Sequence, residues 1–201
     1  MPGLFVTFEG IDRSGKTTQA RLLCEALSGG ALYAREPGGT EIGEHLRELL
    51  KDPALAPDAR TEALLFAAAR SQLVSEVIRP ALDQSRVVVC DRFVDSSLAY
   101  QGGARGLGVE EVEQINRFAT DDLAPDLTFL LDLSPEDAAR RAGMLDRFED
   151  EGLALQRSVS EAYEQLFDPV RWRRVDAGRA AEVVHAEVLA EVRAARREVT
   201  A

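Results

Sequence analysis

The chain has 201 residues, of which 45% are hydrophobic and 29% charged, and its formal net charge at pH 7 is −11. These values are typical of a globular protein with one core, and the acidic balance argues against nucleic acid or an anionic membrane as a partner. The sequence has no apolar run of the roughly 20 residues that a membrane-spanning helix needs. Its two cysteines, Cys24 and Cys90, have no Cys or His partners at metal-binding spacing, so we expect reduced core residues in a cytoplasmic protein.

Short apolar segments alternate with helical patterns along the whole chain. Strands are predicted at 4–9, 31–35, 86–90, 127–132 and 173–176. Helices are predicted at 16–28, 42–51, 59–79, 95–101, 109–119, 135–142, 153–168 and 180–196. Because the strands are apolar on both faces and are separated by helices, the prediction is an α/β fold: a five-stranded parallel sheet covered on both faces, in a single domain over residues 1–201. Ligands of such sheets bind at the carboxyl ends of the strands.

The first predicted strand leads into a glycine-rich loop. The loop reads Gly10-Ile11-Asp12-Arg13-Ser14-Gly15-Lys16-Thr17 and is followed by a helical pattern. Two glycines let backbone N–H groups wrap around a polyphosphate, and the N-terminus of the following helix adds to the attraction. In this pattern Lys16 supplies a point charge and Thr17 a hydroxyl for Mg²⁺. The loop therefore predicts a polyphosphate site; the alternative is an ordinary glycine-rich turn between a strand and a helix.

Two further strand ends carry candidate residues at the same edge of the sheet. The third strand runs into Asp91 and Arg92. A carboxylate in this position helps to hold Mg²⁺ through its water shell, although it could instead cap the next helix. Arg92 suits two-point binding of a phosphate; the alternative is a surface arginine. After the second strand, residues 35–40 read Arg-Glu-Pro-Gly-Gly-Thr and predict a tight turn.

Two helical patterns place polar and aromatic residues on one face. Phe66 and Arg70 are four residues apart in the pattern at 59–79, so an aromatic ring and a guanidinium lie one turn apart. Such a pair can stack on a base and bond its edge, although a phenylalanine such as Phe66, taken alone, is more often a core residue. Ser97, Tyr100 and Gln101 share another helical face by the same spacing. The glycine pair Gly102-Gly103 follows directly, and we expect the helix to end there.

A basic segment follows the predicted helix at 135–142. Residues 140–149 read Arg-Arg-Ala-Gly-Met-Leu-Asp-Arg-Phe-Glu in an otherwise acidic chain. The composition is typical of a mobile lid that closes arginines over a phosphate. The alternative is a solvated run of charges.

Five of these segments, in chain order, resemble motifs of the thymidylate kinase family, the ATP-dependent kinases of dTMP. They are Phe-Glu-Gly-Ile-Asp-Arg-Ser-Gly-Lys-Thr-Thr-Gln at 8–19, 35–40, Leu-Phe-Ala-Ala-Ala-Arg at 65–70, Asp-Arg-Phe-Val-Asp-Ser-Ser-Leu-Ala-Tyr-Gln-Gly-Gly at 91–103, and Asp-Arg-Phe-Glu at 146–149. The block at 91–103 is far more specific than the phosphate loop. The resemblance implies a P-loop NTPase fold with a short mobile lid at about 140–150, the substrates ATP and dTMP, the cofactor Mg²⁺, and a homodimer.

The same resemblance implies roles for the phosphate-binding residues. Residues 10–17 would hold the ATP phosphates, with Thr17 and Asp91 on the Mg²⁺ side. Arg92 would bind the dTMP phosphate, and Asp12 would reach the 3′-hydroxyl of its sugar. Residues 176–178 are expected to border the adenine of ATP.

The remaining matches would form the acceptor's base and sugar pocket. Phe66 would stack on thymine and Arg70 would bond the edge of the base. Ser97 and Gln101 would line the pocket. Tyr100 would lie where a 2′-hydroxyl would clash, which favours deoxyribose.

One departure bears on the catalytic arginine. Members of the family carry it either in the phosphate loop or in the lid, immediately before the lid glycine. That lid position is Ala142 here, while the loop contains Arg13. The chain therefore resembles the subgroup with a loop arginine, and the catalytic groups are expected to be Arg13, Lys16, Asp91, Arg92 and Arg147.

Two other functions remain open from the residues. A deoxynucleoside kinase would share the loop but would phosphorylate a neutral 5′-hydroxyl. Arg92 argues against it, because an acceptor without a phosphate needs no second phosphate-binding residue. The other function is that of a nucleotide-dependent switch. A switch that is a GTPase would need Asn-Lys-x-Asp to bind guanine, whereas the single asparagine, Asn116, is followed by Arg117.

Overall fold

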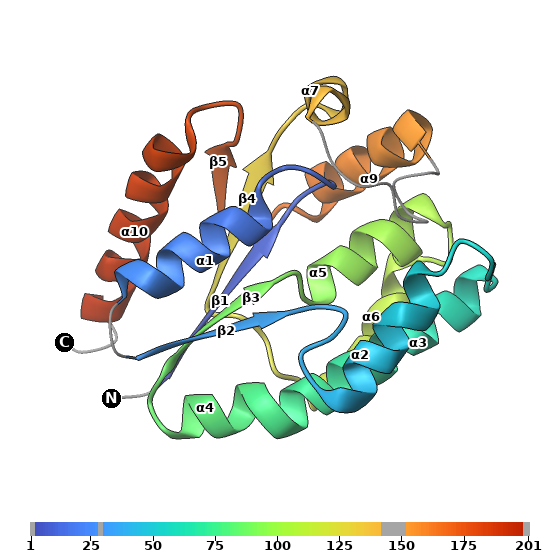
Figure 1. Cartoon of the computed structure of the whole chain (residues 1–201), viewed down its shortest axis with the longest axis horizontal. Helices are drawn as coiled ribbons and strands as arrows, with labels where there is room; N and C mark the ends of the chain where they lie inside the picture. The colour runs from blue at the N-terminus through green and yellow to red at the C-terminus, as the bar shows by residue number, and fades with distance from the viewer. Residues whose placement is uncertain (1–2, 28–29, 142–151, 199–201) are drawn as a thin grey trace.

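Five parallel strands form the centre of the protein in this computed structural model, which describes residues 3–27, 30–141 and 152–198 (Figure 1). The strands are β1 (Leu4–Glu9), β2 (Ala31–Arg35), β3 (Val87–Asp91), β4 (Leu127–Asp132) and β5 (Trp172–Asp176), in the order β2-β3-β1-β4-β5. The predicted α/β fold with a five-stranded parallel sheet is confirmed. The predicted third strand lies one residue too early, and the fifth begins one residue earlier than predicted.

Helices cover both faces of this sheet. They are α1 (Lys16–Ala26), α2 (Glu41–Lys51), α3 (Ala59–Leu73), α4 (Arg79–Asp83), α5 (Val94–Ser97), α6 (Val109–Thr120), α7 (Pro135–Arg140), α9 (Gly152–Leu166) and α10 (Ala181–Glu198). In Figure 1, α1 and α10 lie together on one side of the sheet, and α2, α3, α4 and α6 gather on the other. None of the helices in the described ranges is both long and apolar enough to cross a bilayer.

Strand β1 supplies side chains to two hydrophobic clusters, one on each face. Val6 and Phe8 belong to the cluster that includes residues of α1 and α10. Phe5 belongs to the other cluster, with Leu73 of α3 and Ile78. Successive side chains of a strand point to opposite faces, so a strand that is buried on both sides is apolar at consecutive positions. This burial orders the strand whose end leads into the phosphate loop.

The predicted helix at 59–79 is correct in position but not uniform. After α3 the chain widens into a π-helical turn, η1 (Val74–Ile78), before continuing as α4. Pro80 has no N–H, and its ring would clash with the carbonyl group four residues earlier in a regular helix. A π turn just before the proline relieves that clash.

The prediction that Gly102 and Gly103 end their helix is wrong. A second π-helical segment, η2 (Leu98–Ala104), runs through both glycines. A Cβ on Gly103 would lie 2.6 Å from the Cβ of Ala162 in α9, and one on Gly102 would lie 3.0 Å from the Cα of Val109. The glycines therefore allow close packing of neighbouring helices rather than marking a helix end.

The expected lid at about 140–150 lies mostly outside the described residues. Arg140 and Arg141 are described, and Arg147 is not.

Candidate active site

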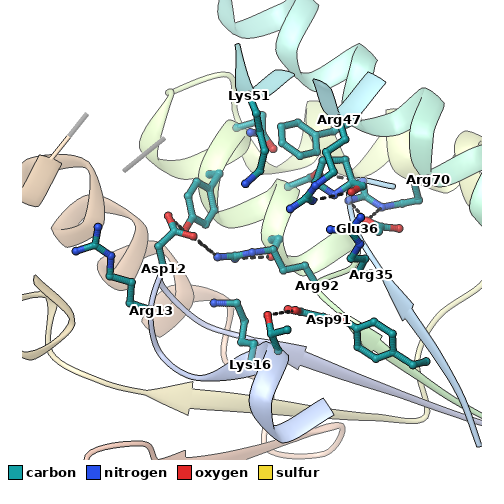
Figure 2. Close-up of a pocket in the computed structure, with 18 of the residues that line it drawn as sticks. Asp12, Arg13, Lys16, Arg35, Glu36, Arg47, Lys51, Arg70, Asp91 and Arg92 are labelled. Atoms are coloured by element: carbon teal, nitrogen blue, oxygen red, sulfur yellow. Dashed lines mark hydrogen bonds and ion pairs between the residues drawn. The ribbon is translucent and has the colours of Figure 1, made fainter. Parts of the chain in front are cut away.

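The carboxyl ends of β1, β2 and β3 meet at a cavity of about 340 Å³ (Figure 2). The phosphate loop, α2, α3 and the α5–η2 segment also contribute to its walls. The predicted residues that line it are Asp12, Arg13, Lys16, Thr17, Phe66, Arg70, Asp91, Arg92, Ser97, Tyr100 and Gln101. Gly10, Ile11, Ser14 and Gly15 form the loop beside it without lining it. Residues that are up to 89 positions apart in the sequence are thus brought to one site.

The cavity is basic although the chain as a whole is acidic. Eight basic side chains line it: Arg13, Lys16, Arg21, Arg35, Arg47, Lys51, Arg70 and Arg92. The acidic side chains among its lining residues are Asp12, Glu36 and Asp91. A cleft with this imbalance in a chain of net charge −11 concentrates positive potential where anionic ligands would bind.

The phosphate loop has the backbone that its two glycines make possible. Gly10 and Gly15 have φ angles of 133° and 100°, in the region that residues with a Cβ rarely adopt. Lys16 folds back over the loop, and its Nζ donates to the carbonyl of Ile11 at 2.6 Å and to Ser14 Oγ at 3.2 Å. Burial, with the nearby charge of Arg92, lowers the pKa of Lys16 to about 8. A bound polyphosphate would reverse this effect, because it favours the charged form of the lysine.

Thr17 and Asp91 provide the oxygen atoms expected of a magnesium site. Thr17 Oγ1 donates a hydrogen bond to Asp91 Oδ2 at 2.5 Å, at the point where α1 begins beside the end of β3. Mg²⁺ prefers oxygen ligands and is commonly held by one or two protein groups together with substrate phosphates. These two side chains therefore fit the ion that the loop motif implies.

Asp12 and Arg92 form an ion pair at the centre of the cavity (Figure 2). Arg92 Nη2 donates to Asp12 Oδ1 at 2.5 Å, and the hydroxyl of Tyr100 donates to Asp12 Oδ2 at 2.9 Å. Gln156 Nε2 from α9 donates to the same oxygen at 2.8 Å. Burial alone would raise the pKa of Asp12, but Arg92 and then Lys16 outweigh it, so the pKa is lowered. No sequence motif indicated Gln156, which α9 brings here from 144 residues away.

Phe66 and Arg70 of α3 both line the cavity. Phe66 is partly exposed and belongs to neither hydrophobic cluster, which disfavours the purely core role. Arg70 is 1% exposed, and its guanidinium donates to Glu36 Oε2 at 2.8 Å, to Ser97 Oγ at 3.0 Å and to the carbonyl of Phe93 at 3.1 Å. Asn116 accepts a further hydrogen bond from Arg70. These partners fix the orientation of Arg70 at the end of the pocket.

Two basic residues of α2 were not identified from the sequence. Arg47 and Lys51 are four residues apart and point from α2 toward the cavity (Figure 2). Arg47 Nη1 also donates to the carbonyl of Pro37 at 2.8 Å, which ties α2 to the turn after β2. The spacing of two basic residues on one helical face was the available signal. It could not be interpreted without knowing that this face of α2 borders the site.

Hydrogen bonds also join the phosphate loop to the start of the expected lid. Arg13 Nη1 donates to the carbonyl of Arg141 at 3.3 Å, and Arg141 Nη1 donates to the carbonyl of Arg13 at 3.0 Å. Arg141 Nη2 also donates to the carbonyl of Ala177 at 2.6 Å. The region after β5 that was expected to border adenine therefore lies next to the phosphate loop.

Comparison with known proteins agrees with these observations. The family model described as thymidylate kinase matches residues 8–188. The thymidylate kinase of Symbiobacterium thermophilum is 50% identical over 193 residues, which cover 92% of this chain and 90% of that protein. The thymidylate kinase of Pelotomaculum thermopropionicum is 48% identical over 201 residues, covering 94% and 92%. The thymidylate kinase of Lactobacillus delbrueckii subsp. bulgaricus is 50% identical over 189 residues, covering 88% and 89%. Because the similarity extends over almost the full length and includes every segment that builds the cavity, the chain belongs to the thymidylate kinase family.

Proposed function

We propose that this chain phosphorylates dTMP to dTDP by direct in-line transfer from Mg²⁺-ATP, with ATP on the phosphate loop and dTMP in the cavity beyond Arg92. The observation that carries this assignment is the position of Arg92. It lies between the phosphate loop, where it donates to the carbonyl of Gly10, and the pocket that holds Phe66 and Arg70. A nucleoside monophosphate bound there would direct its phosphate toward the terminal phosphate of ATP.

The acceptor needs no general base. The second pKa of a phosphate monoester is about 6, so dTMP is mostly a dianion at neutral pH and one of its oxygens is already a nucleophile. Catalysis then consists of bringing two anions into line and neutralising the charge on the transferred group. Lys16, Arg13 and Arg92 line the cavity and would supply this positive charge.

Thr17 and Asp91 would hold the magnesium ion. The ion would supply positive charge to the phosphate oxygens of ATP when bound. The hydrogen bond between the two side chains keeps both oxygens at the end of β3, where the ion is expected.

A coupled assay of ADP release across all nucleoside monophosphates tests the proposal. We expect dTMP to give by far the highest kcat/KM. Thymidine serves as the second acceptor in the same assay, because a deoxynucleoside kinase would use its neutral 5′-hydroxyl. A higher kcat/KM with thymidine than with dTMP would reject the proposed function. ATP turnover that does not depend on dTMP would reject it as well.

Phe66 provides a separate test of the base site. Replacement by alanine is expected to raise the KM for dTMP by about 5–100-fold, because stacking of a base on an aromatic ring contributes roughly 1–3 kcal/mol. The KM for ATP should change less than about two-fold. Steady-state kinetics with each substrate varied in turn measure both constants, and Phe66→Leu is the control for lost apolar contact. Equal increases in the two KM values would show that Phe66 acts only through packing.

We also propose that the protein is a homodimer that associates through α2, α3 and α6. Helix α3 packs between α2 and α6, and exposed apolar side chains lie on all three helices. They are Ile42 and Leu49 on α2, Leu64 on α3, and Val109 and Phe118 on α6, with Phe118 92% exposed. A group of such residues on one side of a protein is typical of an interface, and a second copy of the chain covers it with a matching apolar surface.

Leu64→Glu tests this interface by placing a charge on the central helix. The wild type is expected to sediment as a dimer at micromolar concentration, and Leu64→Glu as a monomer. Val170→Glu is the matched control, because Val170 is 84% exposed but lies outside these three helices. A monomeric wild type, or loss of the dimer in the control, would contradict the assignment.

We propose a cytoplasmic location, in agreement with two cysteines that are both free thiols in the structure.

A further inference from the structure

A buried carboxylate at the end of β1 has no part in the mechanism described so far. Glu9 is 0% exposed and follows the apolar residue Phe8. Burial is the main reason why the pKa of Glu9 is raised to about 7, with Asp95 as the next cause. An ionised carboxylate in such a place opposes folding unless hydrogen bonds compensate. Replacement of buried ionic groups by neutral ones of similar volume is often neutral for stability, so the carboxylate points to a role beyond burial.

Among the described residues, three groups near Arg92 or in α9 donate hydrogen bonds to Glu9. Its Oε1 accepts from the backbone N–H of Phe93 at 2.8 Å. Its Oε2 accepts from Ser96 Oγ at 2.5 Å and from the hydroxyl of Tyr163 at 2.9 Å. One carboxylate thus joins the end of β1 to α5 and to α9.

Two of these contacts adjoin Arg92, one beside its backbone and one beside its guanidinium. Phe93 is the next residue in the chain, and Ser96 Oγ accepts a hydrogen bond from Arg92 Nη1 at 3.1 Å. Arg92 has a φ angle of 71°, a left-handed conformation that costs a residue with a Cβ roughly 1–2 kcal/mol. Such a conformation persists only where the surroundings hold it. The N–H of Arg92 is held by the carbonyl of Phe8 at 3.0 Å, and the next N–H is held by Glu9.

We propose that Glu9 is a positioning residue for the acceptor phosphate: it holds the backbone after Arg92 directly and the Arg92 guanidinium through Ser96. This inference rests on the proposed role of Arg92 in binding that phosphate. Loss of the carboxylate lets the turn relax and leaves the guanidinium held by Asp12 and by the carbonyl of Gly10, without a fixed Ser96. The expected consequence is specific, because only the part of the ligand that Arg92 contacts is affected.

Other charged and titratable groups surround Glu9, so a change of pH would alter their charges as well as that of Glu9. Asp95 is held by Arg171 through two hydrogen bonds of 2.8 and 2.9 Å. The groups that interact electrostatically with Glu9 are Lys16, Cys90, Arg92, Asp95, Tyr163 and Arg171. The test therefore compares ligands with and without a phosphate rather than different pH values.

The experiment measures the dissociation constants of dTMP and of thymidine for the wild type and for Glu9→Gln, by calorimetry without ATP. We expect the dissociation constant of dTMP to rise about ten-fold in Glu9→Gln, within the range of couplings between residues in one hydrogen-bond network. That of thymidine should change less than about two-fold. Ser96→Ala removes the link to the guanidinium but keeps the backbone contact, so it provides the test if Glu9→Gln does not fold, and we expect the same selective loss.

Thr7→Val is the matched control for damage to β1. Thr7 is also 0% exposed, and its hydroxyl is hydrogen-bonded to Thr128 Oγ1 at 2.9 Å. It has no contact with the turn that holds Arg92 among the hydrogen bonds of the described residues. Thr7→Val is expected to lower the melting temperature without changing the ratio of the two dissociation constants.

Arg92→Ala separates failure of this inference from failure of the proposed function. If Arg92→Ala weakens dTMP selectively but Glu9→Gln and Ser96→Ala weaken both ligands equally or neither, the positioning role of Glu9 is rejected. If Arg92→Ala itself leaves the ratio unchanged, the acceptor site is assigned wrongly and the inference fails with it. In the Arg92→Ala background, Glu9→Gln is expected to have no further effect on dTMP binding.

Discussion

Replacement of Arg13 by alanine is expected to lower kcat about 10²–10⁵-fold, the range found for single groups that stabilise charge on a transferred phosphoryl group. The KM values for ATP and dTMP should change little. Arg13 belongs to the phosphate loop, lines the cavity and has a φ angle of 62°. Its effect is expected mainly in the transition state, because negative charge on the transferred group is then shared between two substrates.

The structure supplies a matched control for Arg13. Arg140 is a nearby arginine on α7, but it is exposed and paired with Asp137. Arg140→Ala should therefore leave kcat within about two-fold of the wild type, as surface ion pairs contribute little. Steady-state kinetics at saturating substrate, with melting curves to check folding, measure both variants. A near-normal kcat for Arg13→Ala would reject the loop arginine, and Arg147→Ala would then show whether the lid supplies the charge instead.

Replacement of Arg92 by alanine is expected to weaken dTMP binding about 10²-fold while thymidine binding changes much less. A hydrogen bond to a charged group contributes roughly 1.5–3 kcal/mol, and a guanidinium can make two such bonds to one phosphate. The ion pair with Asp12 increases the effect, because loss of Arg92 leaves that carboxylate facing the incoming dianion. The two charges would then repel each other in a partly buried site.

Arg92→Lys is the control for charge without geometry. Lysine keeps the positive charge but cannot offer two parallel donors, so an intermediate loss of dTMP affinity is expected. Titration calorimetry with dTMP and thymidine distinguishes the outcomes. Parallel losses for both ligands in Arg92→Ala would mean that the residue supports the shape of the pocket and does not bind the phosphate.

Much of the site could be predicted because its signals are local. The phosphate loop lies between a strand and a helix within one stretch of chain, and its glycines allow the backbone angles that the loop adopts. Phe66 with Arg70, and Ser97 with Tyr100 and Gln101, share helical faces by simple spacing, and all five line the cavity. The strand ends at Asp91 and Arg92 could be assigned to the same edge because the sheet is parallel.

Other features depended on contacts between distant segments. Gly102 and Gly103 resemble a helix stop in the sequence, and only the approach of α9 and of Val109 shows that they serve packing. Gln156 carries no motif, yet it donates to Asp12 from α9. Asn116 gave only an argument against a GTPase, whereas in the structure it accepts a hydrogen bond from Arg70.

The sequence by itself determined the class of fold, the polyphosphate loop, the family and the residue types needed for phosphoryl transfer to a nucleotide. These properties follow from backbone preferences, hydrophobic periodicity and motifs, which are encoded over a few residues at a time. Only the tertiary structure decided which side chains face one another: the ion pair of Asp12 with Arg92, the basic residues that α2 adds to the cavity, and the support of Arg92 by Glu9. The physical reason is that hydrogen bonds and ion pairs depend on distances of about 3 Å between atoms, which the packing of separate elements sets.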